Sequence, residues 1–257
     1  MEKILKFTSK LPTEKDEGWE SPSQRDILIS LFQIPFIADN FWLAGGTCLS
    51  AMYLGHRQSE DLDLFTTNEK IHPNDREKIT DLLRAKFDFD MPTVISSTFT
   101  SMMIDNVKVE FVSDIFAYRG ERPEVTLGNV VCRVDFWDNL CIAKFSAFLS
   151  RTSGKDISDI GAILKTARDD LELKEMTNFL ICETRKRDAM ADELTNMFDI
   201  VSYASKMTKN SSYKDVLAKL AQFIVEFTKE LQKETISVKK LPASRPELNQ
   251  TGLNKNR

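Results

Sequence analysis

The chain is poor in the residues that build zinc sites and disulfide frameworks. Its 257 residues include four cysteines and two histidines. No two cysteines form a CxxC pair, and neither His56 nor His72 has a partner at the spacing of zinc ligands, so we expect no zinc site. Cysteines that are few and scattered through a long chain indicate free thiols and a reducing compartment.

Long apolar runs and an excess of positive charge are also lacking. The first twenty residues contain no hydrophobic stretch of signal-peptide length, and no part of the chain reaches the roughly 18 apolar residues of a membrane span. We therefore expect a cytoplasmic protein without a membrane partner. The net charge of −4 argues against a broadly basic nucleic-acid binder, although it leaves room for a local basic patch.

The chain does contain ordinary globular material, patterned in two halves. Hydrophobic residues make up 42% of it, which is enough for a packed core. Up to about residue 134 the patterns are a mixture of strand and helix, and beyond it they are helical. A hairpin turn at Asp105-Asn106 joins two of the expected strands. In the front half we expect helices over 21–38, 47–54 and 73–87, and strands over 41–44, 61–65, 93–100, 107–112 and 130–134.

The back half is expected to be helical until a polar tail begins at about residue 235. Its apolar spacing predicts helices over 138–151, 156–167, 173–185, 191–206 and 213–233. The tail has the composition of a disordered segment. We therefore divide the chain into an α/β unit over 1–134, a helical domain over 135–234 and a tail over 235–257.

The segment DLDLF carries two aspartates on one side of a predicted strand. Successive strand residues point to opposite faces, so Asp61 and Asp63 share a face. Either this face is a solvated acidic edge, or the two carboxylates bind a cation such as Mg²⁺, which prefers oxygen ligands. A third carboxylate on a second strand would complete a two-metal site. Glu110 in VKVEFV is our choice for that role, and Asp105 and Asp114 are the alternatives.

Two glycines precede these aspartates at a predicted strand-to-helix junction. Glycine allows close approach of a ligand to the backbone, and a helix N-terminus offers free N–H groups to an anion. Thr47 can cap this helix or offer its hydroxyl to a phosphate. Alone, Gly45-Gly46 is more typical of a tight strand-to-helix turn. Next to a carboxylate pair, it predicts a cradle for the phosphates of a nucleoside triphosphate.

The stretch GGTCLSAMYLGHRQSEDLDLF resembles the nucleotidyltransferase signature of the DNA polymerase β-like superfamily. That signature is a GG or GS turn, a helix, and D-x-D on the following strand. In particular, the stretch is similar to the AbiEii/AbiGii toxin family, whose members show GGTAL and then G-x-R-x-S-x-D-L-D-x-F. The matching positions are Gly45, Gly46, Thr47, Leu49, Gly55, Arg57, Ser59, Asp61, Leu62, Asp63 and Phe65.

A second stretch, LCIAKFSAFLSRTSGKDISDI, resembles the same family. The family carries a helix with A-x-K followed by an R-x-x-x-K-D-x-x-D pattern. The matching positions are Lys144, Arg151, Lys155, Asp156 and Asp159. The two stretches span about residues 40–165, and the resemblance does not reach the last third of the chain. One departure is Glu110, since the corresponding strand of the family often ends in Asp.

The resemblance implies an α+β nucleotidyltransferase fold, with a small mixed sheet flanked by helices and a C-terminal helical region that completes the cleft. It implies Mg²⁺-dependent transfer of a nucleoside monophosphate from an NTP to an RNA hydroxyl, with tRNA 3′ ends as prominent acceptors. It also implies the toxin of a bacterial toxin–antitoxin or phage abortive-infection pair, with a winged-helix antitoxin as partner. For the helical back half, the sequence leaves open whether RNA, the antitoxin or a second copy of the chain is the partner.

The residues fall into two expected groups. Lys144 lies on an apolar helix face, from which a lysine either snorkels to water or reaches into a cleft. Asp159 can pair with Lys144 or Lys155, and Arg57 can pair with Asp61 or a phosphate. The expected catalytic residues are Asp61, Asp63, Glu110, Lys144 and Asp159, of which Asp61, Asp63 and Glu110 hold metal. The expected nucleotide-binding residues are Gly45, Gly46, Thr47, Arg57, Ser59, Lys155 and Asp156.

Two other functions remain open from the sequence. One is a nucleotidyltransferase of the same fold that modifies a small molecule or a protein hydroxyl. The other is a nucleotide-binding module that keeps the acidic site without turnover. The intact D-L-D segment favours an enzyme over the second of these.

Overall fold

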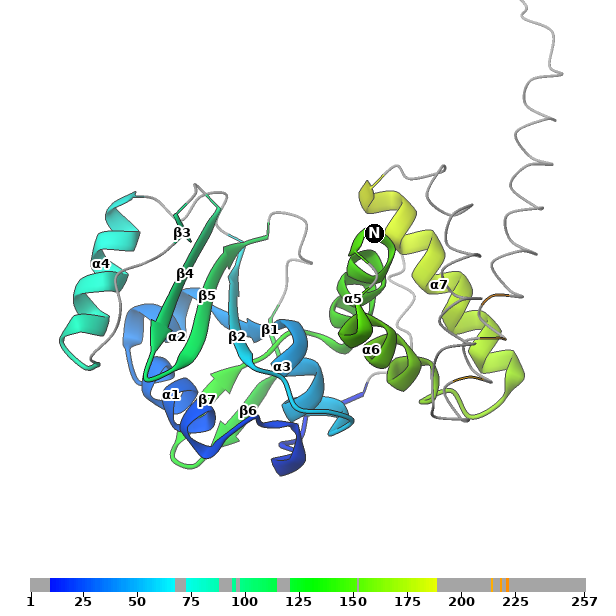
Figure 1. The fold of residues 1–257 in the computed structure, drawn as a ribbon, viewed down its shortest axis with the longest axis horizontal. Helices are drawn as coiled ribbons and strands as arrows, with labels where there is room; N and C mark the ends of the chain where they lie inside the picture. The colour runs from blue at the N-terminus through cyan, green and yellow to red at the C-terminus, as the bar shows by residue number, and fades with distance from the viewer. Residues whose placement is uncertain are drawn as a thin grey trace, which may run out of the picture.

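The computed structural model of the chain describes residues 10–67, 73–87, 94–95, 98–114, 121–151 and 153–188, with residues 214, 218 and 221 in addition. Figure 1 shows a sheet with its flanking helices on one side and three helices, α5, α6 and α7, on the other. The arrangement is the α+β class that the sequence predicts, with strands in the front half and helices behind them.

Helices and strands are each numbered in the order in which they occur along the chain. The helical segments of the front half are η1 (Asp16–Gly18), α1 (Pro22–Phe32), α2 (Pro35–Asn40), α3 (Gly45–Thr47), the π-helix η2 (Cys48–Leu54) and α4 (Pro73–Arg84). The strands are β1 (Trp42–Ala44), β2 (Asp61–Thr66), β3 (Val94–Ile95), β4 (Phe99–Ile104), β5 (Val107–Ser113), β6 (Glu124–Leu127) and β7 (Val130–Arg133). The helices of the back half are α5 (Trp137–Arg151), α6 (Gly154–Leu164) and α7 (Asp170–Asp188).

The main sheet is mixed and has the strand order β1-β2-β5-β4-β3. β2 and β5 pair in parallel, whereas the other neighbours are antiparallel. β6 and β7 form a separate antiparallel hairpin. The chain after β7 joins the β1 edge, where Val134 bridges to Leu43. β1 therefore lies between the rest of the sheet and the segment that leads into α5.

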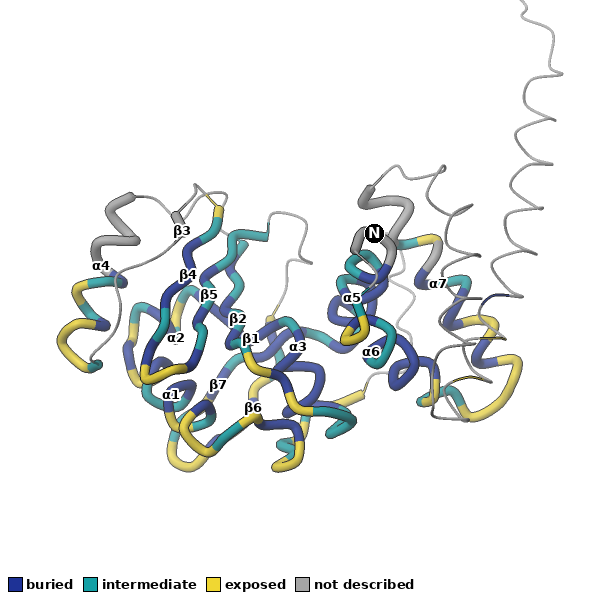
Figure 2. The backbone as a smooth tube through the Cα atoms, viewed as in Figure 1, coloured by how far each residue is buried: buried dark blue, intermediate teal, exposed yellow. Residues whose placement is uncertain are grey.

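One face of the sheet is packed and the other is open. Leu62 and Leu64 on β2 and Val109 and Phe111 on β5 are fully buried, in one cluster with residues of α1. The alternate positions of β2 and β5 are only partly buried, and they include the acidic residues. This alternation follows from the two-residue period of a strand. Figure 2 shows buried and partly buried segments alternating along these strands.

The turn between β4 and β5 confirms the predicted hairpin. Asp105 and Asn106 have φ angles of 47° and 67°, so both central residues occupy the left-handed region. Two such residues match the twist of a two-residue hairpin, and Asn and Asp tolerate this region better than most residues.

Residues 21–38 form two helices where the sequence predicted one. α1 begins after Ser21, whose side chain accepts a hydrogen bond from the Gln24 N–H, and it ends at Phe32. Ile34 is extended, and Pro35 starts α2. Proline lacks an N–H and disfavours helical backbone in the residue before it, so the helix restarts there.

Two further details differ from the prediction. Residues 47–54 were expected to be an α-helix, but Cys48–Leu54 form a π-helix after the single turn of α3. Its end at Gly55, with φ of 62°, is as predicted. The second difference is β6, which the sequence analysis missed, because Glu124–Leu127 is only four residues long and follows a proline.

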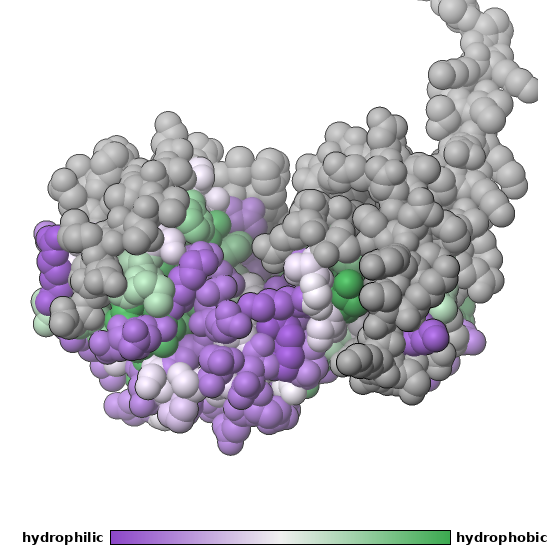
Figure 3. All heavy atoms as spheres, viewed as in Figure 1, coloured by the Kyte–Doolittle hydropathy of each residue, from purple (hydrophilic) through white to green (hydrophobic). Residues whose placement is uncertain are grey.

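The predicted helix over 191–206 and the tail over 235–257 lie outside the described residues. Of the predicted helix over 213–233, only Lys214, Ala218 and Ala221 are described, and all three are helical. Within the described ranges, no helix is both long enough and apolar enough to cross a membrane. On the face drawn in Figure 3, hydrophilic residues cover most of the described surface of the front half.

Candidate active site

The open face of the sheet brings the predicted carboxylates together. The parallel register places Asp63 on β2 opposite Glu110 on β5, and Asp61 opposite Lys108. The Lys108 ammonium makes a close ion pair with Glu110 and lies 4.0 Å from Asp61 Oδ1. Asp105 lies in the β4–β5 turn, and Asp114 lies beyond the end of β5. Glu110 is therefore the candidate in register with Asp63.

Electrostatics make Asp63 unusual among these carboxylates. Its burial and the adjacent charge of Glu110 raise the pKa of Asp63 to about 7, and the positive charge of Lys144 opposes that shift. The hydrogen bond with Glu110 raises the pKa of Lys108. Two carboxylates on neighbouring strands repel each other, and Lys108 supplies a positive charge beside Glu110.

The donor set suits a hard divalent cation by its chemistry. Asp61, Asp63 and Glu110 offer only oxygen atoms, which are the ligands that Mg²⁺ prefers. The same side chains stand on one sheet face, where the charge of Glu110 adds to burial in raising the pKa of Asp63. In the described ranges no three acidic, histidine or cysteine side chains are already arranged around one point. Asp61 instead turns toward Lys108, so metal binding by these three residues stays a prediction.

Gly45 fits tightly against the carboxylates. Its φ is +65°, which L side chains rarely adopt. A Cβ built at Gly45 would lie 1.7 Å from Asp63 Oδ2, so any side chain would displace that carboxylate. Ala44, the residue before it, is in register with Asp63. The glycine is thus required both by the turn and by the approach of the Asp63 side chain.

Gly46 faces the polar and cationic side chains expected to bind phosphate. A Cβ built there would lie 2.6 Å from Ser59 Oγ, 3.0 Å from Arg57 Nη2 and 3.4 Å from Lys144 Nζ. Two side chains from the segment before β2 and one from α5 therefore converge on one short backbone segment. Gly46 has no room for a side chain. The hydroxyl, guanidinium and ammonium groups around it are of the kinds that bind phosphate oxygens.

Thr47 makes a contact that the sequence did not predict, and its role in phosphate binding stays a prediction. It is fully buried, and its hydroxyl donates to the backbone carbonyl of Asp61. It makes no capping hydrogen bond to the helix that it begins. The contact ties the glycine turn to the start of β2, and so positions the turn beside the carboxylates.

Asp159 is the centre of a buried cluster that joins the two halves of the chain. Its carboxylate accepts hydrogen bonds from Arg57 Nε at 2.6 Å and Nη2 at 2.9 Å, and lies 3.0 Å from Lys144 Nζ. His56 Nε2 lies 2.8 Å from the same carboxylate. Burial alone would raise the pKa of Asp159, but the bonds from His56 and Arg57 and the charge of Lys144 hold it well below its usual range.

This cluster settles the pairing that the sequence left open. Lys144 pairs with Asp159, as one of two alternatives predicted, and Arg57 pairs with Asp159 and not with Asp61. The Lys144 side chain is only 10% exposed, so it reaches inward and does not snorkel to water. Arg57 and Lys144 are therefore held at Gly46 by a carboxylate behind them.

Two predicted nucleotide-binding residues lie apart from the cluster. Asp156 is fully buried and forms a capping box with Ser153 at the start of α6. That box satisfies backbone N–H groups at the helix start and accounts for an acidic residue at this position. Lys155 is exposed and pairs with Glu60 at 3.2 Å. A role of either residue in nucleotide binding stays a prediction.

Sequence reasoning missed two residues of the site. Lys108 lies two positions before Glu110 on the same strand, so the strand alternation places both on the open face. This signal was available but was not used. His56 was considered only as a zinc ligand, although it precedes Arg57 directly. Its contact with Asp159 depends on α6 and could not be inferred from spacing.

Comparison with a solved nucleotidyltransferase toxin supports the fold. MenT4, a nucleotidyltransferase toxin from Mycobacterium tuberculosis H37Rv, aligns with a TM-score of 0.51 and 14% identity over 85% of this chain and 88% of that one. A nucleotidyltransferase-like antigenic protein from Paracoccidioides brasiliensis aligns with a TM-score of 0.40 and 16% identity, over 72% of this chain and 94% of that one. The Megavirus polyadenylate synthase gives 0.38 and 13% over 79% of this chain and 49% of the synthase. At these identities the likeness concerns the fold.

Sequence comparison gives two further results. No curated protein matches the chain significantly. A family model does match, over residues 26–233, and its description is "Nucleotidyl transferase AbiEii toxin, Type IV TA system". The match includes both stretches that resembled the family, and it extends beyond them at each end.

Proposed function

Because the chain belongs to the nucleotidyl transferase AbiEii toxin family and is a nucleotidyltransferase, we propose that it transfers a nucleoside monophosphate from an NTP to a hydroxyl of RNA, with tRNA 3′ ends as acceptors. In a cell this would be the toxic activity of a cytoplasmic toxin–antitoxin or phage-defence system, restrained by an antitoxin. The observation that supports it best is the register of β1, β2 and β5. That register places Asp63 and Glu110 beside the Gly45-Gly46 turn.

The acidic side chains would hold the divalent cation that such a transfer requires. One sheet face presents the carboxylate oxygens of Asp61, Asp63 and Glu110. The ammonium of Lys108 balances part of their negative charge. A bound pair of Mg²⁺ ions would supply charge stabilisation to the attacking and leaving oxygens. The residues themselves set where the α-phosphorus lies, since the carboxylates are fixed on two paired strands.

The residues around Gly46 would bind the β- and γ-phosphates. Arg57 and Lys144 bring positive charge to a backbone turn that has no room for a side chain, and Ser59 adds a hydroxyl. Phosphoryl transfer depends mainly on positioning and on stabilising developing charge. Asp159 contributes by holding both cations in place, so it acts as a positioning residue.

A growth experiment tests this function first. The wild type and an Asp61→Ala/Asp63→Ala double variant are expressed in a bacterial host, and growth is followed after induction. Asp105→Asn is a matched control, because this acidic residue lies in the β4–β5 turn and a left-handed φ is tolerated by Asn. We expect arrest by the wild type and the control, and normal growth with the double variant.

A transfer assay tests for nucleotidyl transfer and, separately, identifies the acceptor. Purified protein is incubated with Mg²⁺, each α-labelled NTP and total tRNA, and the label is located on RNA or protein. Label on tRNA that is lost in Glu110→Gln supports the proposal. Label on protein, or pyrophosphate release with a small hydroxyl compound only, would show a nucleotidyltransferase whose acceptor is not RNA. Normal growth with the wild type at confirmed soluble levels would contradict toxicity.

A further inference from the structure

His56 belongs to the Asp159 cluster but was not among the expected site residues. Gly55, with φ of 62°, ends η2, and the next side chain, that of His56, turns into the interior. It is 6% exposed, and its Nε2 lies 2.8 Å from Asp159 Oδ1. An ionised carboxylate only accepts hydrogen bonds, so Nε2 carries a proton and donates to Asp159.

The donors divide between the two oxygens of the Asp159 carboxylate. Oδ1 accepts from His56 Nε2 and from Arg57 Nε. Oδ2 accepts from Arg57 Nη2 and lies 3.0 Å from Lys144 Nζ. Arg57 thus bonds to both oxygens, an arrangement that holds only while the two planar groups face each other edge to edge. The bond from His56 opposes rotation of the carboxylate away from this orientation.

The position of both cations at Gly46 depends on that orientation. Arg57 and Lys144 have long side chains with several rotatable bonds, and each makes its direct ion pair with Asp159. Their terminal nitrogens lie 3.0 Å and 3.4 Å from the position of a Cβ at Gly46. The Asp159 side chain has no exposed surface, so water does not replace a lost donor there. A rotated carboxylate would therefore release one or both cations from the glycine turn.

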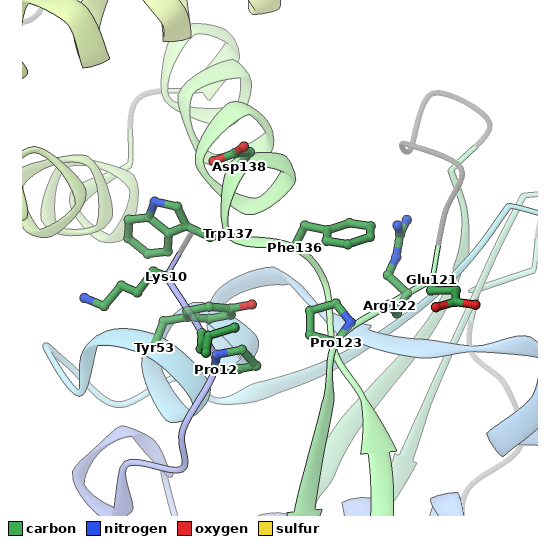
Figure 4. Close-up of a pocket in the computed structure, with 10 residues that line it drawn as sticks. Lys10, Pro12, Tyr53, Glu121, Arg122, Pro123, Phe136, Trp137 and Asp138 are labelled. Atoms are coloured by element: carbon green, nitrogen blue, oxygen red, sulfur yellow. The ribbon is translucent and has the colours of Figure 1, made fainter. Parts of the chain in front are cut away.

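A second buried carboxylate shows that neighbouring donors decide whether a cation is hydrogen-bonded. Asp135 accepts from Phe136 N and Asn139 Nδ2. Its Oδ1 lies 3.4 Å from Arg122 Nε, yet the Arg122 guanidinium forms no hydrogen bond with the described part of the chain. The guanidinium lies instead over the rings of Trp42 and Phe136, and Figure 4 shows it beside Phe136. Proximity to a carboxylate is thus not enough to fix a cation.

His56 can act on the cations only through Asp159. Its second ring nitrogen, Nδ1, is buried and has no hydrogen-bond partner among the residues that the structure describes. One ring nitrogen is therefore covered, and the other is bonded to Asp159. The ring has no polar atom left to contact a nucleotide, so any effect on nucleotide binding passes through the carboxylate.

We propose that His56 is a positioning residue for the triphosphate of the NTP. Its Nε2–H fixes the Asp159 carboxylate, and the carboxylate holds Arg57 and Lys144 at Gly46. The proposal rests on the function proposed above, which assigns the phosphates to the residues around Gly46. It adds the residue that orients those groups without contacting the substrate.

Binding of inorganic triphosphate to the full chain tests the proposal without turnover. Affinity is measured by calorimetry with Mg²⁺ present, and urea unfolding gives the stability of each variant. His56→Leu removes the donor at a similar volume, and His56→Met replaces it if that variant does not fold. His56→Gln restores an N–H donor. Thr177→Val is the matched control, because it removes a buried hydrogen bond within α7, from the Thr177 hydroxyl to the Leu173 carbonyl.

We expect His56→Leu to weaken triphosphate binding about tenfold, since a hydrogen bond to a charged group is lost. His56→Gln should bind within about threefold of the wild type. Thr177→Val should bind as the wild type does, although its unfolding midpoint falls. In an Asp159→Asn background, where the carboxylate is already removed, His56→Leu should cause at most about a twofold further loss.

Other outcomes overturn the proposal in distinguishable ways. Wild-type affinity in folded His56→Leu would show that Asp159 keeps its orientation without His56, with the proposed function untouched. Binding as weak in His56→Gln as in His56→Leu would exclude the donated hydrogen bond. An equal loss in Thr177→Val would assign the effect to general stability, and a tenfold loss in the Asp159→Asn background would show that His56 acts independently of Asp159. A wild type that binds no triphosphate would overturn the proposed phosphate site itself.

Discussion

The glycine turn can contact the carboxylates only because Gly45 has no side chain. Gly45 has a φ of +65°, and the position of its absent Cβ is taken by Asp63 Oδ2. Two costs are therefore combined at one residue, a strained backbone for any L side chain and a steric conflict with a candidate catalytic group. This feature can be predicted from the sequence, because two glycines before a helix already indicate a turn that excludes side chains.

Gly45→Ala should lower nucleotidyl transfer about 100-fold or more and destabilise the fold by about 1–3 kcal/mol, because it strains the turn and moves Asp63. Activity is measured by pyrophosphate release, and stability by urea unfolding. Gly154→Ala is the control, since a Cβ there meets nothing within 4 Å and φ is not in the left-handed region. Equal activity of both variants would show that Asp63 need not touch the turn.

The hairpin turn offers a stabilising change at a single residue. Asp105 and Asn106 both have positive φ, and glycine adopts this region without the strain of a side chain. Asn106→Gly should raise the free energy of unfolding by about 0.5 kcal/mol and leave activity unchanged. The midpoint of urea unfolding measures it. Asn106→Val, which should be destabilising by more than this, is the opposing control, and a stabilised valine variant would refute the assigned turn geometry.

At the scale of elements, α6 shows how one short segment combines capping with the site. Ser153 and Asp156 form a capping box at its start, and Asp159 follows one turn later. The spacing places Asp156 on the helix end and Asp159 on the side that meets Arg57 and Lys144. The sequence predicted both acidic residues as site residues, since spacing alone does not separate a cap from a site.

Ser153→Ala should cost about 1 kcal/mol of stability, because the helix loses the hydrogen bond from the Asp156 N–H to the Ser153 hydroxyl. The KM for NTP should change little, since the side chains nearest to Gly46 are those of Ser59, Arg57 and Lys144 and not that of Ser153. Urea unfolding and steady-state kinetics measure the two effects. An NTP KM raised several-fold in Asp156→Asn, with stability kept, would instead indicate that Asp156 contacts the nucleotide.

At the scale of the whole molecule, Asp159 links the α/β front half to the helical back half. It lies on α6 but binds Arg57, which precedes β2, and it also binds Lys144 on α5. The cluster is largely buried, and both cations make their direct ion pairs with this carboxylate. Asp159→Asn should destabilise the protein by about 3 kcal/mol at pH 7, because it removes the charge of the carboxylate that both cations contact directly.

The pH dependence of this effect has a defined sign. The folded-state pKa of Asp159 lies below the value in the unfolded chain, so the unfolded state binds more protons as pH falls below about 5. Its stabilisation is therefore present at neutral pH and lost as pH falls through the acidic range. Urea unfolding between pH 3 and 7 should show the wild type approaching Asp159→Asn at the acid end. For Asp81→Asn, which changes an exposed aspartate, the free energy of unfolding should vary with pH in parallel with that of the wild type.

Much of the fold and the position of the carboxylates were determined by the sequence itself. The alternation of DLDLF and VKVEFV sets which side chains share a face, because a strand has a two-residue period that no packing changes. Gly-Gly and Asp-Asn likewise encode backbone conformations that other residues resist. Local properties of this kind are written in neighbouring residues, so a single sequence is enough to recover them.

The contacts between distant residues were decided by tertiary structure alone. Whether Lys144 faces water or Asp159, and whether Arg57 pairs with Asp61 or Asp159, depends on how α5 and α6 pack against the sheet. The same is true of Arg122 on Trp42, which lie 80 positions apart in the chain. Such pairings are set by the burial of whole elements and by the balance of charge within them, and no spacing in the sequence records either.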